Sequence, residues 1–240
     1  MTDNNYVTLM DHMGDDLSVV NAARVSFGKR VEYDDDTEWQ DVDYERWYGQ
    51  IPVLRDGDTK LIKYLAKHNH WSPFGHTALQ FHIKAPVFVA RQLVKHQVGL
   101  VWNEISRRYV SDEPEFYTPE VWRASAENKK QGSSDEEIDI NPSTGSGPQM
   151  VDNYQQVLKN AKWTYEHLLD LGVCPEQARM VLPQSMITEW YWSGTVYAFA
   201  SVCNLRCKPQ VQLETQMIAK EIDIQAGKLF PVSWEALPNE

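Results

Sequence analysis

Residues 77–85, TALQFHIKA, carry the pattern that most restricts how this chain can fold. Apolar and polar side chains alternate along the segment, with Leu79, Phe81 and Ile83 against Gln80, His82 and Lys84. This period of two predicts a half-buried β-strand. Pro86 follows directly, and proline is well tolerated at the first position of a helix. We therefore predict a helix over about 86–97.

Three further segments have the patterns of regular structure. Residues 150–171 place apolar side chains at helical spacing, and Gly172 is a typical helix stop. Residues 185–193, SMITEWYWS, are aromatic and β-branched enough for a second strand. A last helix over about 210–229 has a buried stripe formed by Val211, Ile218, Ile222 and Leu229. Strands separated by helices, without regular alternation, indicate an α+β fold.

Two segments differ in composition from the rest of the chain. Residues 32–58 are strongly acidic, and residues 124–149 are rich in Ser, Gly, Pro and charge. The second segment has too little apolar surface to offset the entropy of ordering, so we expect it to be mobile. The chain of 240 residues is 42% apolar, enough for one core. We predict a single domain over 1–240 with these two segments inserted.

The net charge of −11 narrows the classes of partner. A nucleic-acid surface is basic because it neutralises phosphates, so no nucleic-acid partner is predicted. No apolar run approaches the roughly 20 residues that span a bilayer, and the first residues do not form an export signal. The odd set of Cys174, Cys203 and Cys207 argues against disulfides and suits a reducing compartment. We therefore expect a soluble, cytoplasmic protein.

Two groups of residues are weighed as metal sites. His68, His70 and His76 contain the H-x-H spacing of some zinc sites, but no cysteine or carboxylate stands nearby as a fourth ligand. The intervening proline and glycine favour a turn instead. Cys203 and Cys207 can share a helix face, but without a second ligand pair we interpret them as buried free thiols. No metal site is predicted.

Residues 95–110, KHQVGLVWNEISRRYV, gather donors and acceptors in one short stretch. Glu104 lies between cations, and Arg107 and Arg108 follow the hydroxyl of Ser106 directly. An acidic protein that binds an anion must concentrate its few cations in one place, and the planar fork of arginine suits phosphate. The alternative is a charged stretch that simply faces water. The pattern favours a site for a small anionic molecule.

Other polar side chains accompany this segment. Gln92, Lys95 and His96 share one side of the first predicted helix. Arg179 and Arg206 stand among apolar neighbours, where an arginine must be paired or bound to a ligand. Either arginine could pair with a core carboxylate instead, so the residues alone leave both alternatives open.

The chain resembles the flavin-dependent thymidylate synthases over nearly its whole length, apart from the two inserted segments. The matching stretches follow the family's order and approximate spacing: MGDDLSVVNAARVSF, KHNHWSPFGHTALQFHIKAPVFVARQ, NEISRRY, EQARMVLP and NLRCKPQVQLETQ. Five ordered matches form a specific signal. The resemblance implies a single α+β domain with a mainly antiparallel sheet flanked by helices.

The resemblance also implies an activity. Members of this family are homotetramers whose active sites are shared between subunits. They bind FAD and dUMP together and form dTMP, with methylenetetrahydrofolate and NADPH as co-substrates. They need no cysteine nucleophile, because the flavin supplies the reduction while the protein supplies position and charge. A cytoplasmic methyltransferase of dTMP biosynthesis is therefore expected.

Site residues follow from the matching positions. Arg206 matches the arginine that stabilises dUMP ionised at N3, an electrostatic activation of the base. The resemblance places eight residues at the nucleotide: Gln92, Lys95, Glu104, Ser106, Arg107, Arg108, Arg179 and Arg206. It places seven at the flavin: Ser26, His70, Ser72, Lys95, His96, Gln97 and Glu104.

The chain departs from the family pattern near the flavin. The family's Arg-His-Arg reads Lys-His-Gln at residues 95–97, and one residue more than in the family separates it from Ser106. Thr195 and Tyr197 stand where the family shows an asparagine and an arginine that touch the flavin. We expect these changes to weaken FAD binding. Two alternatives stay open: a related pyrimidine nucleotide hydroxymethylase, and a nucleotide-binding homologue without catalysis.

Overall fold

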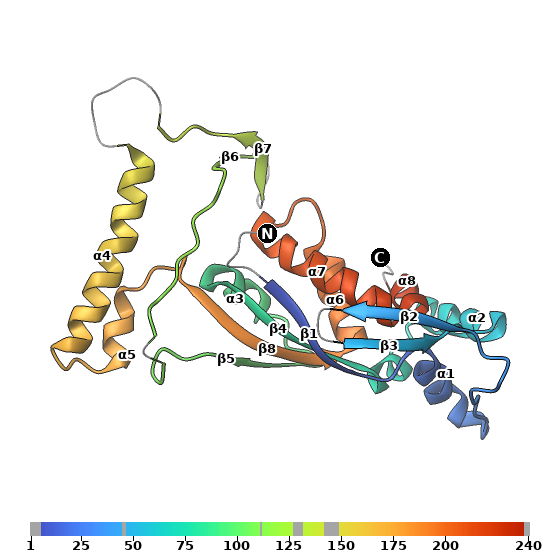
Figure 1. The fold of residues 1–240 in the computed structure, drawn as a ribbon. Helices are drawn as coiled ribbons and strands as arrows, with labels where there is room; N and C mark the ends of the chain where they lie inside the picture. Colours follow the sequence, from blue (N-terminus) through green and yellow to red (C-terminus); the bar gives the residue numbers. More distant parts are fainter. Residues whose placement is uncertain (1–5, 45–46, 111, 127–131, 142–148, 238–240) are drawn as a thin grey trace.

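The structure is a computed structural model that describes residues 6–44, 47–110, 112–126, 132–141 and 149–237 (Figure 1). A four-stranded antiparallel sheet lies at its centre. Its strands, in spatial order, are β1 (Tyr6–Met13), β4 (Ala78–Pro86), β8 (Ile187–Thr195) and β5 (Leu100–Glu104). Both predicted strands are confirmed with small shifts in their bounds, and so is the α+β class.

One face of this sheet builds the hydrophobic core. Phe199 packs edge-on against Phe81 of β4 and Trp192 of β8, with 5.2 Å between ring centroids in each pair. A buried aromatic side chain removes on the order of 150–250 Å² from water, so this cluster does much to hold the helices on the sheet. The helices that contribute to the core include α1 (Asp16–Arg24), α2 (Asp56–Lys67), α3 (Val87–Leu93), α6 (Val196–Arg206), α7 (Leu213–Leu229) and α8 (Pro231–Ala236).

The opposite face of the sheet is polar, as the alternation in β4 predicts. His82 stacks on Tyr191 with 4.9 Å between ring centroids, and its Nε2 lies 3.1 Å from a carboxylate oxygen of Glu189. The Tyr6 hydroxyl donates to the same oxygen at 3.1 Å. Polar and aromatic side chains on this face satisfy one another instead of facing a second core layer.

The helix after β4 is shorter than predicted. α3 spans Val87–Leu93, and Pro86 is its N-cap, with φ −62° and ψ 149°, not its first helical residue. Lys95 and His96 therefore lie beyond the helix, which corrects the prediction that they extend its polar side. Lys95 is exposed and His96 is half-buried, so the two side chains have different surroundings.

Two glycines fix the path from α3 to the sheet. Gly99 has a φ of +74°, a conformation that side chains rarely adopt, and β5 begins at the next residue. At Gly194 in β8, a Cβ would lie 2.4 Å from the carbonyl oxygen of Gly99. The absence of a side chain at Gly194 therefore lets the loop approach closely and lets β5 form the edge of the sheet.

The two segments of unusual composition each contain a hairpin. β2 (Trp39–Tyr44) pairs with β3 (Trp47–Pro52), and Val42 and Ile51 from this hairpin are buried in the core. β6 (Arg123–Ser125) pairs with β7 (Ser133–Glu137). Residues 127–131 and 142–148 of the second segment lie outside the described residues, so its mobility stays a prediction.

The helix predicted over 150–171 is confirmed and stands away from the sheet. α4 (Met150–Asp170) leads into α5 (Pro175–Ala178) and the 3-10 turn η3 (Arg179–Val181), and Figure 1 shows α4 and α5 as an arm beside the main body. Gly172 follows the helix with a φ of +83°, the left-handed conformation that a helix stop requires. The arm therefore returns the chain to the cleft described below.

The last predicted helix is confirmed as α7 (Leu213–Leu229), except at its start. Ile218, Ile222 and Leu229 are buried in α7, but Val211 precedes the helix, which begins at Leu213. Within the described ranges, no helix has both the length and the apolar character needed to cross a membrane.

Candidate active site

A cleft lies beside the C-terminal end of β5, between the start of α3 and the segment that precedes β8. Its volume is ≈ 250 Å³. The charged residues that line it are Arg91, Glu104, Arg107 and Arg179, and apolar walls come from Val87, Leu182 and Met186. Three guanidinium groups around one carboxylate leave net positive charge in a chain whose total is −11. The cleft can therefore hold an anion.

Glu104 is held in place by two donors. Thr188 Oγ1 donates to one carboxylate oxygen at 2.8 Å, and Trp102 Nε1 donates to the other at 3.2 Å. The donors are close because Trp102 lies two residues earlier in β5 and Thr188 lies in the paired strand β8. A carboxylate with both oxygens engaged keeps a fixed orientation at the cleft.

The two arginines after β5 point in different directions. Arg107 donates to the backbone oxygen of Asp112, and only 10% of its side chain is exposed. Arg108 folds back over the ring of Tyr109 at 4.9 Å, and its Nε donates to Ser106 Oγ at 3.2 Å. Arg107 thus lines the cleft, whereas Arg108 and Ser106 form a pair on the more exposed side.

A second group of predicted residues gathers around the end of α6. Arg206 Nε donates to His96 Nε2 at 3.0 Å, and an Nη of Arg206 lies 3.5 Å from the backbone oxygen of Gln92. The side chain of Gln92 also donates to Gln212, just before α7. The partners found for Arg206 are thus an imidazole and a carbonyl, so the alternative of a core carboxylate is not what the structure shows.

His96 is neutral in this arrangement. Burial, followed by the charge of Arg206, lowers the pKa of His96 from its ordinary value. Since Nε2 accepts the bond from Arg206, the neutral ring carries its proton on Nδ1. The guanidinium of Arg206 is therefore the charged member of the pair.

Three other predicted flavin residues, Ser26, His70 and Ser72, belong to segments near the start of α6. Ser26 belongs to η1 (Val25–Phe27), directly after α1, and α1 packs against η2 (Ser72–His76). Ser26, His70 and Ser72 are exposed, as are the rings of Phe27 and Trp71. This surface combines hydroxyl groups with flat apolar rings.

Within one chain these groups are well separated. Trp71 lies beside Tyr197 in the first turn of α6, with 6.3 Å between ring centroids, whereas Arg206 ends that helix. At a helical rise of about 1.5 Å per residue, the two places are roughly 14 Å apart. The loop with Lys95 and Gln97, both exposed, joins the two places, since His96 bonds Arg206 and the Gly99 carbonyl accepts from the Thr195 N–H at the start of α6.

Two residues of the site were missed by the sequence predictions. Arg91 lines the cleft and directly precedes Gln92 in α3. Its position next to a predicted binding residue was a usable signal, because neighbouring helical residues can serve different sides of one helix. Thr188 carried no signal, since its contact with Glu104 spans 84 positions of sequence.

The structure agrees with the turn at the histidines, where η2 spans Ser72–His76, and with free thiols at Cys203, which is buried, and Cys207, which is half-buried. The rings of His68 and His70 lie 6.3 Å apart, and His68 packs against Tyr64. In the described part of the chain, the group of three possible ligands whose donor atoms come close together is Cys203, Cys207 and Asp223. No feature of the sequence around Asp223 indicates that it joins the two cysteines.

The antiparallel sheet, its helical cover and the arginine-lined cleft define an α+β protein with a site for a small anionic ligand. The chain belongs to the family described as thymidylate synthase complementing protein, whose sequence pattern it matches over residues 8–232. It is 36% identical to the flavin-dependent thymidylate synthase of Thermus thermophilus over 234 residues, 98% of this chain and 76% of that protein. With the flavin-dependent thymidylate synthase of Kosmotoga olearia the identity is 35%, over 98% of this chain and 90% of that protein.

Solved structures with this fold include a nucleotide methylase. The UMP/dUMP methylase PolB from Streptomyces cacaoi, bound with 5-Br UMP, superposes with a TM-score of 0.74 at 28% identity, over 98% of this chain and 93% of that one. The same protein bound with 5-Br dUMP gives a TM-score of 0.71 at 29% identity, over 97% and 93%. The expected fold is thereby confirmed.

Proposed function

We propose that this protein is a flavin-dependent thymidylate synthase. It forms dTMP from dUMP by reductive methylation, with FAD as cofactor and with methylenetetrahydrofolate and NADPH as co-substrates. The observation that carries this proposal is the cleft lined by Arg91, Arg107 and Arg179 together with Glu104. Family membership and the likeness to PolB support dUMP as the anion.

The arginines and the glutamate of the cleft suit different parts of a nucleotide. Arginine donates two parallel hydrogen bonds to a phosphate, so the guanidinium groups of Arg91, Arg107 and Arg179 suit the phosphate of dUMP. Glu104 accepts hydrogen bonds only, and its fixed carboxylate therefore suits a hydroxyl or N–H donor of a ligand. Both kinds of group are needed for a nucleotide, which carries an anion at one end and donors elsewhere.

Arg206 is the proposed catalytic residue. Its bonds to His96 and to the Gln92 carbonyl fix the guanidinium before a substrate arrives. A fixed cation stabilises negative charge on a pyrimidine base without a reorganisation cost at the moment of reaction. Because His96 is neutral, Arg206 carries the positive charge at this place. Arg206 thus stabilises the form of dUMP that is ionised at N3. The ring carbon of this anion is more easily alkylated.

The residues present fit a flavin nucleotide. The exposed rings of Phe27 and Trp71 offer flat surfaces on which a planar ring system can stack, and Ser26 and Ser72 place hydroxyl groups beside them. Lys95 and His96 would contribute a cation and a ring N–H. The flavin, when bound, supplies the reducing equivalents for the transferred carbon.

We further propose that the active site is completed between subunits of a homotetramer. The cleft of ≈ 250 Å³ is smaller than the roughly 300–1,000 Å³ of usual ligand pockets, and two ligands must be held. The flavin residues and Arg206 are far apart along α6 in one chain. The arm also exposes Val157, Trp163 and Leu171, apolar side chains that a second copy can cover. A cytoplasmic location agrees with the three free cysteines.

The test is product analysis with purified protein. With dUMP, FAD, methylenetetrahydrofolate and NADPH, dTMP is the expected product, and the protein should be yellow from bound oxidised flavin. Hydroxymethylated product would favour the related hydroxymethylase. A colourless protein that binds dUMP without turnover would favour the nucleotide-binding homologue.

A second substrate is suggested by one specific comparison. PolB is described as a UMP/dUMP methylase and is bound with 5-Br UMP in one structure. Parallel reactions with UMP and dUMP would show which is used. We expect dUMP to be preferred, since the sequence relatives are named thymidylate synthases.

A further inference from the structure

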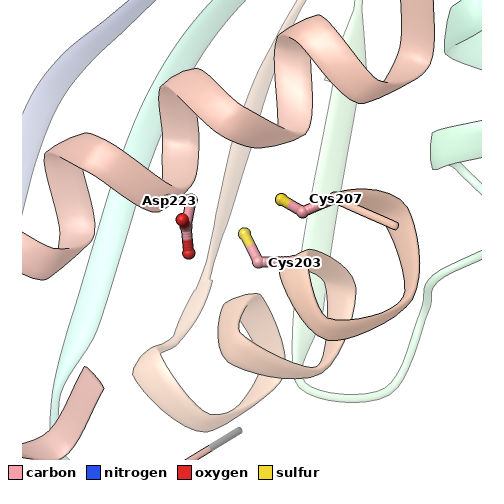
Figure 2. Close-up of side chains that lie close together, drawn as sticks. All are labelled: Cys203, Cys207 and Asp223. Atoms are coloured by element: carbon pink, nitrogen blue, oxygen red, sulfur yellow. The ribbon is translucent and has the colours of Figure 1, made fainter. Parts of the chain in front are cut away.

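Two cysteines and one aspartate meet on the side of α6 that faces α7. Cys203 lies in α6, Cys207 is the C-cap of that helix, and Asp223 lies in α7 (Figure 2). One donor atom from each residue, two sulfurs and one carboxylate oxygen, lies within 4.8 Å of the other two. The spacing is short enough for all three atoms to contact one ion.

The fold explains this convergence. Residues four apart on a helix share a face, so Cys203 and Cys207 stack one turn apart. That face of α6 packs on α7, which brings in the side chain of Asp223. Trp234 Nε1 in α8 donates to Asp223 Oδ1 at 2.8 Å. A hydrogen bond from outside the ligand set orients a carboxylate in the way that metal sites commonly use.

The cysteines are free thiols, and Cys203 Sγ donates to the backbone oxygen of Ala219 in α7 at 3.5 Å. Ala219 lies one helical turn before Asp223, so this contact holds the sulfur on the side of α6 that faces the carboxylate.

We propose that Cys203, Cys207 and Asp223 bind a divalent metal ion of the zinc class. Thiolate sulfur selects zinc over magnesium or calcium, and a carboxylate oxygen is an accepted third zinc ligand. Binding releases one proton from each thiol, and a water molecule fills the fourth position of a tetrahedral ion. Cys207 and Asp223 are half-buried, so an ion can enter from solvent.

Such an ion would act on the structure around Arg206. Cys207 follows Arg206 directly, so a metal that joins Cys207 to Asp223 fixes the last turn of α6 against α7. The guanidinium of Arg206 would keep its hydrogen bond to His96, and the backbone that carries it would be fixed by the metal at the next residue. The metal site itself does not depend on the proposed enzyme activity, because its ligands are separate from the cleft.

The experiment uses the full chain, purified under reducing conditions after growth with zinc. Metal content by mass spectrometry is expected to approach one zinc per chain. After the metal is removed, titration with Co²⁺ should produce a saturable thiolate-to-cobalt absorption band. Cys207→Ala and Asp223→Asn should each weaken Co²⁺ binding by about 10-fold or more. Cys174→Ser, at an exposed cysteine outside the group, should bind as the unaltered chain does.

Three results would overturn the proposal. One is a Co²⁺ titration of the unaltered chain without a saturable thiolate band. Another is equal binding by the unaltered chain and by Asp223→Asn, with circular dichroism showing that both are folded. The third is a Cys203–Cys207 disulfide in protein purified without reductant, detected as the loss of two hydrogens, in chains that take up no metal after reduction.

Discussion

Arg206 donates a hydrogen bond through Nε to Nε2 of His96 at 3.0 Å, across 110 positions of sequence. The bond exists only while His96 is neutral, because a protonated imidazole has no acceptor nitrogen. Protonation would also place two cations side by side. The contact therefore links the protonation of one residue to the position of the proposed catalytic group.

The first prediction concerns acid stability. Burial and the charge of Arg206 lower the pKa of folded His96 below its ordinary value of 6.5. In the window between the lowered pKa and 6.5 the unfolded chain binds more protons at this residue, so stability falls as the pH drops through that window. His96→Gln keeps an acceptor for Arg206 but does not titrate. Its melting temperature should fall less between about pH 7 and pH 5 than that of the unaltered chain. Parallel curves would contradict this.

Arg206→Ala should abolish most of the activity without unfolding the protein. Loss of one preorganised group that stabilises developing charge costs on the order of 10²-fold or more in rate. Arg206→Lys keeps the charge but loses the Nε donor to His96, so it should retain more activity than Arg206→Ala. The measurement is dTMP formation, with circular dichroism as the check on folding. Near-normal turnover in Arg206→Ala would show that Arg206 has another role.

Arg91→Ala should weaken dUMP binding. A hydrogen bond to a charged group is worth about 1.5–3 kcal/mol, so the dissociation constant should rise by roughly 10-fold or more. Arg30→Ala is the matched control, because Arg30 is 76% exposed and pairs only loosely with Glu32 at 3.8 Å. Binding is measured by calorimetry with dUMP. Equal constants for both variants would remove Arg91 from the site.

The double substitution Lys95→Arg, Gln97→Arg should strengthen flavin binding by about 10-fold, since it restores two bidentate donors. Both residues are exposed in the loop between α3 and β5, so the change should not disturb the core. Quenching of flavin fluorescence in the presence of dUMP measures the affinity. Unchanged affinity would mean that the additional residue before Ser106 has moved this loop away from the flavin.

The ion pair between Arg123 and Glu214 should contribute strongly to stability. Nη2 of Arg123 lies 2.8 Å from Glu214 Oε1, and 7% of the Glu214 side chain is exposed. Burial raises the pKa of Glu214, but the hydrogen bond and charge of Arg123 outweigh it and hold the pKa below its ordinary value. Arg123→Ala leaves a buried carboxylate unpaired and should lower the free energy of unfolding by roughly 3–5 kcal/mol.

Two comparisons define the Arg123 measurement. Lys63→Ala breaks the exposed pair with Glu235 and should cost at most about 1 kcal/mol. Arg123→Ala combined with Glu214→Gln removes the buried charge and should recover part of the loss. Urea unfolding of the three variants gives the free energies. A loss for Arg123→Ala no larger than that for Lys63→Ala would contradict the prediction.

Local patterns were enough to predict the elements whose burial follows from their own sequence. β4 was predicted from its alternation, and the end of α4 from Gly172, because side-chain period and backbone conformation are local properties. β5 was not predicted, since it is a short edge strand whose side chains are largely exposed, and it depends on its pairing with β8. The predicted helix after Pro86 was too long because its end is set by the approach of Gly99 to Gly194.

The site was predictable only in part for the same reason. Glu104, Arg107 and Arg179 were singled out by their residue types and by the resemblance, and they do line one cleft. Thr188 and Asp223 act through contacts that join distant parts of the chain, and nothing in their neighbours marks them.

The position of β8 has a consequence for synthesis. This strand lies between β4 and β5, yet it belongs to the last quarter of the chain. On the ribosome, β1 and β4 can pair early, but β5 has no neighbour and the apolar face of β4 has no Phe199 to cover it. Pairing between distant segments is slow, and exposed strand edges aggregate. We therefore expect the sheet to stay incomplete, with apolar surface open to a chaperone, until nearly all of the chain has been translated.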